Sequence, residues 1–314
     1  MIRRAVISLL LMLGTPIVLA NPVQFLIPGG EGGGWDTTAR EAGKAMVSEG
    51  IISAAQFTNY SGGGGGRALL YLVNEPGSHQ STMMVQSTPL VLRKLTGVIP
   101  KGFRDVRPIS TMIAEYEVIV VKNDSNIKNL QDLIQAAKND NRNTVIIGGS
   151  SKGSLDHITA GLLYKAAGLK VNSMRYAASD GGGDALDRLK NNVGVALVTG
   201  YGEVVDELNK GNLRAIGITS ADPVKGVNIP TFKSQGYDVV FANWRGFFAT
   251  KNLPDEKFEM FQNSLTKLNS SATWQEVRGK YGWAEFVKQG SELDDFLQKQ
   301  EEDITAILKE LDML

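Results

Sequence analysis

The chain of 314 residues contains no cysteine and only two histidines, His79 and His157. Without cysteine it cannot form disulfides, thiolate nucleophiles or cysteine-ligated metal centres. Two imidazoles are too few for most transition-metal sites, so we expect neither a metal nor a cofactor. An excess of positive charge is also lacking, because 33 Lys and Arg residues balance 33 Asp and Glu residues. This balance argues against nucleic acid as a partner.

Long apolar runs are lacking after the N-terminus. Two arginines precede the apolar residues 6–13, and Val18-Leu19-Ala20 places small residues where a signal peptidase cuts. The run is short for a bilayer span and is followed by glycine and proline. These features are typical of a secretory signal peptide. We therefore predict that residues 1–20 are removed and that a periplasmic chain begins at Asn21.

Glycine is abundant, with 35 residues, and it gathers in loops that follow apolar segments. The stretches 29–36 and 61–66 each follow an expected strand and open into an expected helix. Glycine lets the backbone turn sharply and approach another molecule closely. A helix that begins at such a loop presents unpaired N–H groups and a partial positive charge. Both loops therefore predict anion sites built on backbone amides, without Lys or Arg.

Strands and helices alternate along most of the chain. Strands are expected at 23–27, 56–60, 82–85, 117–121, 144–147, 193–198 and 214–219, and helices at 36–49, 67–73, 129–138, 155–167, 258–268 and 293–311. This spacing predicts an α/β fold with mostly parallel sheets. The sequence of strand, Gly/Ser loop and helix start recurs at 148–155 and 178–184. Such loops lie at the carboxyl ends of strands, so four of them predict two lobes that face a common cleft.

One motif favours an enzyme. The segment 149–153 (GSSKG) matches the nucleophile elbow G-x-S-x-G of serine hydrolases. Such an enzyme needs a histidine that comes after the serine and is delivered by a distant loop. Here His79 precedes the motif, and His157 follows Ser151 by only six residues within the same expected helix. A secreted serine hydrolase using Ser151 is therefore kept as the alternative to a binding protein.

Several motifs share their order and spacing with one family. Residues 28–40 (PGGEGGGWDTTAR) fit its first binding loop, 59–66 its second glycine loop, and 148–157 (GGSSKGSLDH) its G-S-x-x-G-S-x-x-H segment. Residues 228–236 and 244–247 fit two later segments. Over nearly all of its mature length, the chain resembles the periplasmic solute-binding proteins of tripartite tricarboxylate transporters, the TctC/Bug family.

The resemblance implies a two-lobed Venus-flytrap fold of the type II-like periplasmic binding proteins. Lobe 1 is expected to comprise 21–118 and 246–314, and lobe 2 to comprise 119–245. The resemblance further implies a monomer without enzyme activity. From the resemblance we expect this protein to capture a di- or tricarboxylate, with a citrate-like ligand as the first candidate, and to deliver it to the membrane permease subunits of a tripartite tricarboxylate transporter. Another small carboxylate or an amide stays open as the ligand.

The resemblance also implies that ligand oxygens are held mainly by backbone amides and small hydroxyl groups. The expected ligand-binding residues are Gly32, Gly33, Gly34, Trp35, Asp36, Ser61, Gly62, Gly63, Ser150, Ser151, Gly153, Ser154, Gly181, Gly182 and Tyr201. We expect the turns 32–36 and 150–154 to close on opposite ends of the ligand, one from each lobe. Asp36 is an equally good N-cap for the first helix. Arg40, about one helical turn further on, is expected to matter less than the amides.

Overall fold

The computed structural model describes residues 22–149, 152–224, 226–310 and 312–314. The predicted signal peptide 1–20, the expected mature start Asn21 and the site candidates Ser150 and Ser151 lie outside these residues. Within the described ranges, no helix combines the length and the apolar character needed to cross a membrane.

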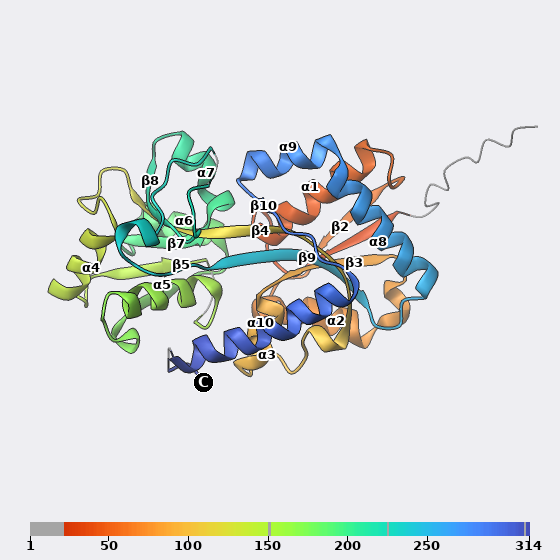
Figure 1. Cartoon of the computed structure of the whole chain (residues 1–314), viewed down its shortest axis with the longest axis horizontal. Coiled ribbons are helices and arrows are strands. Elements are labelled where there is room, and N and C mark those ends of the chain that lie inside the picture. Colours follow the sequence, from red (N-terminus) through yellow and green to blue (C-terminus); the bar gives the residue numbers. More distant parts are fainter. Residues whose placement is uncertain (1–21, 150–151, 225, 311) are drawn as a thin grey trace, which may run out of the picture.

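Two α/β lobes lie end to end, and two long strands, β4 (Val106–Lys122) and β9 (Ala242–Thr250), run between them (Figure 1). The strand order is β2-β1-β3-β9-β4-β7-β5-β6, and β8 and β10 also pair with β4. This two-lobed α/β fold is the fold class that the sequence predicted. The boundaries between the lobes in the sequence stay a prediction.

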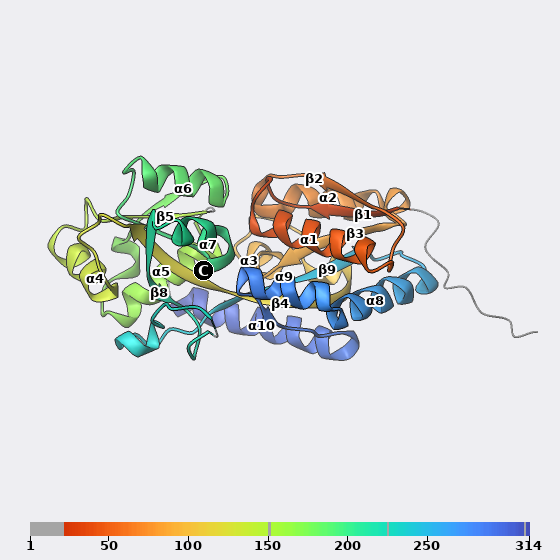
Figure 2. The same cartoon turned by 90° about the horizontal axis from the view of Figure 1, so that it is seen from above.

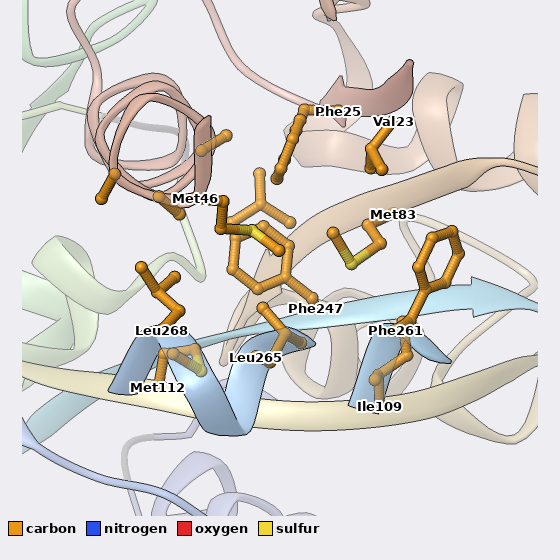
Figure 3. Packing of buried hydrophobic residues seen from close by; sticks show 14 of the residues in the cluster. Val23, Phe25, Met46, Met83, Ile109, Met112, Phe247, Phe261, Leu265 and Leu268 are labelled. Atoms are coloured by element: carbon orange, nitrogen blue, oxygen red, sulfur yellow. The ribbon is translucent and has the colours of Figure 1, made fainter. Parts of the chain in front are cut away.

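Lobe 1 is built on three strands that are parallel to one another. Its elements are β1 (Val23–Ile27), α1 (Gly34–Ser48), β2 (Ala55–Asn59), α2 (Gly66–Asn74), β3 (Thr82–Ser87), α3 (Pro89–Leu95), α8 (Asp255–Ser270), α9 (Ala272–Tyr281), β10 (Ala284–Glu285) and α10 (Gly290–Glu310). Strand β1 pairs in parallel with β2 and β3, and β3 pairs antiparallel with β9. The apolar side chains of Phe25, Met83, Phe247 and Leu265 converge between α1 and α8 (Figure 3).

Lobe 2, at the other end of β4 and β9, is also built on three parallel strands. Its elements are α4 (Leu130–Asn139), β5 (Val145–Gly148), α5 (Leu155–Ala166), β6 (Arg175–Ala178), α6 (Gly182–Lys190), β7 (Ala196–Gly200), α7 (Tyr201–Asn209) and β8 (Leu213–Ile218). Successive residues of β4 supply opposite faces of the sheet. Ile119 and Val121 join one buried cluster, and Val118 and Val120 join another. Helices thus cover both faces of this half of the sheet.

The pairing of the crossing strands differs from the mostly parallel sheet that the sequence predicted. Strand β4 is antiparallel to β9 in lobe 1 and to β7 and β8 in lobe 2. The chain leaves lobe 1 along β4 and returns along β9, so these two strands must run in opposite directions. Alternation of strands and helices predicts parallel pairing only where a helix connects neighbouring strands.

Candidate functional site

The glycine-rich loops of the two lobes meet where the lobes touch. Gly34, in the first turn of α1, donates its backbone N–H to Oε1 of Glu203 on α7 over 3.0 Å. Arg93, on α3, donates from Nη1 to the carbonyl oxygen of Lys152, just before α5, over 3.3 Å. Viewed from above, α1 and α3 of lobe 1 lie beside α7 of lobe 2 (Figure 2). The starts of α1 and α7, the last turn of α3 and the segment before α5 therefore lie at the inter-lobe interface.

Asp36 organises the first loop. The helix α1 begins at Gly34, two residues earlier than expected, so the N-cap is Gly33 and the N-cap assignment of Asp36 is wrong. The Asp36 carboxylate folds back and accepts from Gly32 N over 3.0 Å and from Arg40 Nε over 2.8 Å. It also accepts from Asn59 Nδ2 over 2.8 Å. Asp36 is only 4% exposed, so these contacts fix the loop from inside.

Gly34 marks the closest approach between the first loop and a charged side chain. A Cβ atom at this position would lie 2.1 Å from Nη2 of Arg245. Gly33 differs, because its backbone is extended and its Cβ would meet only Gly30 O at 3.4 Å. Both glycines were predicted to bind the ligand. Of the two, only Gly34 lies where the structure leaves no room for a side chain.

Trp35 connects the first glycine loop to the second. Its Nε1 donates to Ser87 Oγ over 2.9 Å, and its ring packs closely on Gly65, where a Cβ would lie 3.0 Å away. The residues Gly62 to Gly65 all have positive φ, a conformation that glycine adopts at little cost. Ser61, Gly62 and Gly63 are exposed in this structure, whereas a Cβ at Gly64 would lie 2.5 Å from Nε of Arg93.

In lobe 2, the loop before α5 is held by its own helix. Ser154 is the N-cap, and its Oγ accepts from His157 N over 3.4 Å and lies 3.4 Å from Tyr176 Oη. Gly153 N donates to Nδ1 of His157 over 3.0 Å. Burial, followed by the nearby charge of Lys152, lowers the pKa of His157 to about 4. His157 is thus a neutral acceptor tied to its own loop, and this geometry gives the hydrolase alternative no support.

The other lobe 2 candidates lie on α6 and α7. Gly181 is the N-cap of α6 and has φ 126°. A Cβ at Gly182 would lie 2.1 Å from Oε2 of Glu203, so this glycine admits the carboxylate. Tyr201 begins α7 and packs its ring against Gly282, where a Cβ would lie 2.6 Å from Cε1 of the tyrosine. Tyr201 therefore contacts the turn after α9.

Several amides at these loops and helix starts already bind carboxylates of the protein itself, including those of the predicted residues Gly32 and Gly34. Gly34 N donates to Glu203, and Gly202 N, at the start of α7, donates to Glu115 Oε1 over 2.6 Å. Asp180 N, before α6, donates to Asp184 Oδ2 over 3.0 Å. The backbone of Gly149 donates in the same way to Asp156. Helix N-termini favour negative charge, and here the protein supplies it internally.

Beneath the loops lies a group of charged side chains that we call the inter-lobe cluster. Its members are Arg93, Glu115, Glu117, Asp156, Glu203 and Arg245. All except the partly buried Glu203 are at most 8% exposed. Arg245 forms an ion pair with Glu115, and Glu117 shares a hydrogen bond with Asp156. Four carboxyl groups thus share a buried site with two guanidinium groups.

Crowding of carboxyl groups shifts their proton affinities. Burial first, and then the charges of Asp156 and Glu115, raise the pKa of Glu117 well above its ordinary value. Burial and the charge of Glu203 raise the pKa of Asp156 to about 7. Burial and Glu115 also raise the pKa of Glu203. Burial also acts on the basic group Arg93, whose pKa it lowers. The cluster therefore resists further negative charge.

Some atoms of the cluster have no hydrogen-bond partner among the described residues. They are Nε of Arg93, Nη1 of Arg245, Oε2 of Glu117 and, apart from its ion pair with Arg245, Oε2 of Glu115. Nearby, β3 and the turn after it add Oε1 of Gln86 and Oγ1 of Thr88. Buried polar groups are normally paired, so these atoms are free to bind a ligand or water. No group of three or more His, Asp or Glu residues within the described ranges has an arrangement suited to a metal ion.

Sequence reasoning found the loops and missed the cluster. Three members, Glu115, Glu117 and Arg245, lie on β4 and β9 within otherwise apolar strands. A charged residue inside a buried strand is rare unless it is paired, and this signal was available in the sequence. Arg93 offered no such signal, because an arginine near the end of a short helix is ordinarily exposed.

Comparison with known proteins places these features in a family. The family described as tripartite tricarboxylate transporter family receptor matches residues 79–313. BugT of Bordetella pertussis is 24% identical over 243 residues, which cover 74% of this chain and 71% of BugT. Two solved structures share the fold. MatC from Rhodopseudomonas palustris with bound malate has a TM-score of 0.78 at 16% identity and covers 94% of this chain and 100% of MatC. Rpa4515 of R. palustris with adipate has a TM-score of 0.83 at 16% identity, covering 93% and 97%.

Proposed function

The chain belongs to the tripartite tricarboxylate transporter receptor family of periplasmic solute-binding proteins, and from this premise we propose that it captures a small carboxylate between its lobes. It then delivers that ligand to the membrane permease subunits of a tripartite transporter. Malate and adipate, the ligands of the two structural relatives, are the first candidates, together with citrate.

One observation carries this proposal, namely the two buried guanidinium groups where the lobes meet. Arg93 on α3 and Arg245 on β9 both have a buried N–H without a partner among the described residues. A guanidinium is always charged and donates in the fork geometry that matches a carboxylate. A carboxylate bound here touches lobe 1 and lobe 2 together, because Arg93 already donates to Lys152 across the interface.

A ligand-dependent rise in melting temperature tests the proposal. A ligand at a hundredfold excess over its dissociation constant adds about 2.7 kcal/mol to the stability of the folded state. For a chain of this size the expected rise is roughly 2–4 °C or more. Malate, adipate and citrate are compared with neutral sugars and with nucleotides. A rise with a sugar and none with any carboxylate contradicts the proposal.

Export is a separate part of the proposal. The basic start, the short apolar run 6–13 and the residues Val18-Leu19-Ala20 favour cleavage after Ala20. N-terminal sequencing of protein from the periplasmic fraction is expected to begin at Asn21. A chain that keeps Met1 and fractionates with the cytoplasm contradicts export.

A further inference from the structure

We propose that Glu203 is a built-in competitor of the ligand. Before a ligand binds, its carboxylate occupies the place between the starts of α1 and α6 that a carboxylate of the ligand takes. The ligand binds by displacing Glu203, so this side chain lowers the affinity instead of contributing to it. The inference rests on the proposed function and adds to it the residue that sets how tightly the site binds.

The Glu203 carboxylate connects the two lobes. Its Oε1 accepts from the backbone N–H of Gly34, in the first turn of α1, over 3.0 Å. Its Oε2 accepts from Oγ1 of Thr199, near the end of β7, over 2.6 Å. A Cβ at Gly182, in the first turn of α6, would lie 2.1 Å from the same Oε2. Gly34 and Gly182 were both predicted to bind the ligand, and both lie against this one side-chain carboxylate.

A buried guanidinium at the same place is the second observation. Arg245 lies against Gly34, since a Cβ there would be 2.1 Å from Nη2. Arg245 is 3% exposed, its Nη1 has no hydrogen-bond partner within the described residues, and its positive charge favours the ionised form of Glu203. The amide of Gly34 and the charge of Arg245 attract any carboxylate at this position, so a ligand carboxylate and Glu203 compete for them.

Glu203 is the member of the inter-lobe cluster that is able to leave. The other members are at most 8% exposed, whereas Glu203 is partly exposed and lies in the first turn of α7. Burial, followed by the charge of Glu115, raises the pKa of Glu203, so its ionised form is disfavoured here relative to water. A ligand carboxylate that replaces it leaves the negative charge of the buried cluster unchanged once Glu203 turns into solvent.

Competition of this kind determines the sign of a mutational effect. A ligand that binds only the fraction of molecules whose site is open to it has its apparent affinity reduced by that fraction. Removing the Glu203 carboxylate is therefore expected to tighten binding. Removing a carboxylate that still bridges the lobes in the bound state weakens binding instead, so the sign of the change distinguishes a competitor from a bridge.

The first experiment titrates wild type and Glu203→Ala with malate, adipate and citrate by isothermal calorimetry. At least one of the three is expected to bind the variant about tenfold more tightly, because the bond between the Gly34 amide and a charged group no longer has to be broken. Glu203→Gln keeps the shape and loses the charge, so its affinity is expected to lie between the two. This variant also provides the test if Glu203→Ala does not fold.

Asp206→Ala, at an exposed position on the same helix α7, is the matched control and is expected to keep the wild-type affinity. Equal or weaker binding to the folded Glu203 variants overturns the inference and leaves the proposed function standing. Failure of all three ligands to bind any of these proteins contradicts the proposed function itself.

Acetate provides a second test, because it replaces the carboxylate and the adjoining carbon that Glu203→Ala removes. At a tenfold excess over its dissociation constant, acetate is expected to raise the melting temperature of Glu203→Ala by roughly 2 °C or more, relative to the same concentration of chloride. Wild type, in which Glu203 fills this place, and Asp206→Ala are expected to respond less. An equal response in all three proteins shows that acetate binds elsewhere and overturns the inference.

Discussion

The glycine loops and the inter-lobe cluster beneath them differ in how visible they are in the sequence and in how many of their polar atoms are paired in the structure. The loops are prominent in the sequence, and in the structure the amides of Gly32 and Gly34 are bound by the protein's own carboxylates Asp36 and Glu203. The cluster is inconspicuous in the sequence, yet it holds buried atoms of Arg93, Glu117 and Arg245 that lack partners within the described residues. The comparison teaches that the loops set the shape of the interface and that the cluster sets its chemistry.

Replacing Gly34 by valine is expected to have the largest effect, because it breaks the close packing of loop on cluster. The new side chain collides with Arg245, whose Nη2 would lie 2.1 Å from the Cβ. Overpacking of this kind costs about 1–3 kcal/mol, so binding is expected to weaken by up to roughly a hundredfold. Calorimetric titration and thermal melting measure the two effects. Gly33→Ala is the matched control, and an equal loss there contradicts a role specific to Gly34.

Removing the guanidinium of Arg93 tests whether the cluster or the loops bind the carboxylate. Arg93→Gln is expected to weaken binding of every carboxylate by roughly ten- to a hundredfold, since a hydrogen bond to a charged group contributes about 1.5–3 kcal/mol. Arg104→Gln, which alters an exposed ion pair with Glu301, is the control. Unchanged affinity in Arg93→Gln would show that the loop amides bind the carboxylate. The conclusion that the cluster sets the chemistry of the site would then be wrong.

The acidity of the cluster predicts how stability depends on pH. The pKa of Asp156 is raised to about 7 in the folded protein, whereas an unfolded Asp titrates near 3.9. Between these values the folded state binds more protons than the unfolded state, so this group makes the folded protein less stable as the pH rises toward 7. Glu117 and Glu203, whose pKa values are also raised, act in the same direction.

Melting curves of ligand-free protein between pH 4.5 and pH 8 check this prediction. Asp156→Asn is expected to flatten the fall in melting temperature and to be more stable than the wild type at pH 8, because it removes a buried charge. Asp132→Asn, at a partly exposed position in the first turn of α4, controls for general charge effects. If the melting temperature falls equally steeply with pH in Asp156→Asn and in the wild type, Asp156 is not the cause of the fall.

The smallest effect is expected where a loop side chain only caps a helix. Ser154→Ala removes an N-cap whose Oγ accepts from His157 N over a long 3.4 Å. The expected loss is about 1 kcal/mol of stability with little change in affinity. Chemical denaturation and titration of the same variant measure both quantities. A large loss of affinity at unchanged stability shows that this hydroxyl binds the ligand, which returns the lobe 2 loop to the role that the sequence suggested.

Much of the fold was predictable from local pattern. The strands β1, β3 and β5 follow from short continuous apolar runs, and the apolar stripes of α8 and α10 follow from a period of 3.6 residues. The start of α1 was displaced by two residues, because Asp36 turns back to bind Gly32 instead of capping the helix. The antiparallel pairing of β4 with β9 depends on residues more than a hundred positions apart, and no local pattern records it.

The sequence by itself determined the two-lobed α/β class, the family and the positions of the glycine loops, because these depend on local periodicity, motif order and the backbone freedom of glycine. Only the tertiary structure decided what those loops face. Gly34 and Glu203 are 169 residues apart and meet across the two lobes. Whether an amide is free or already bound, and whether a carboxyl group is exposed or crowded by others, depends on such long-range contacts. The chemistry of the site is therefore a property of the folded chain.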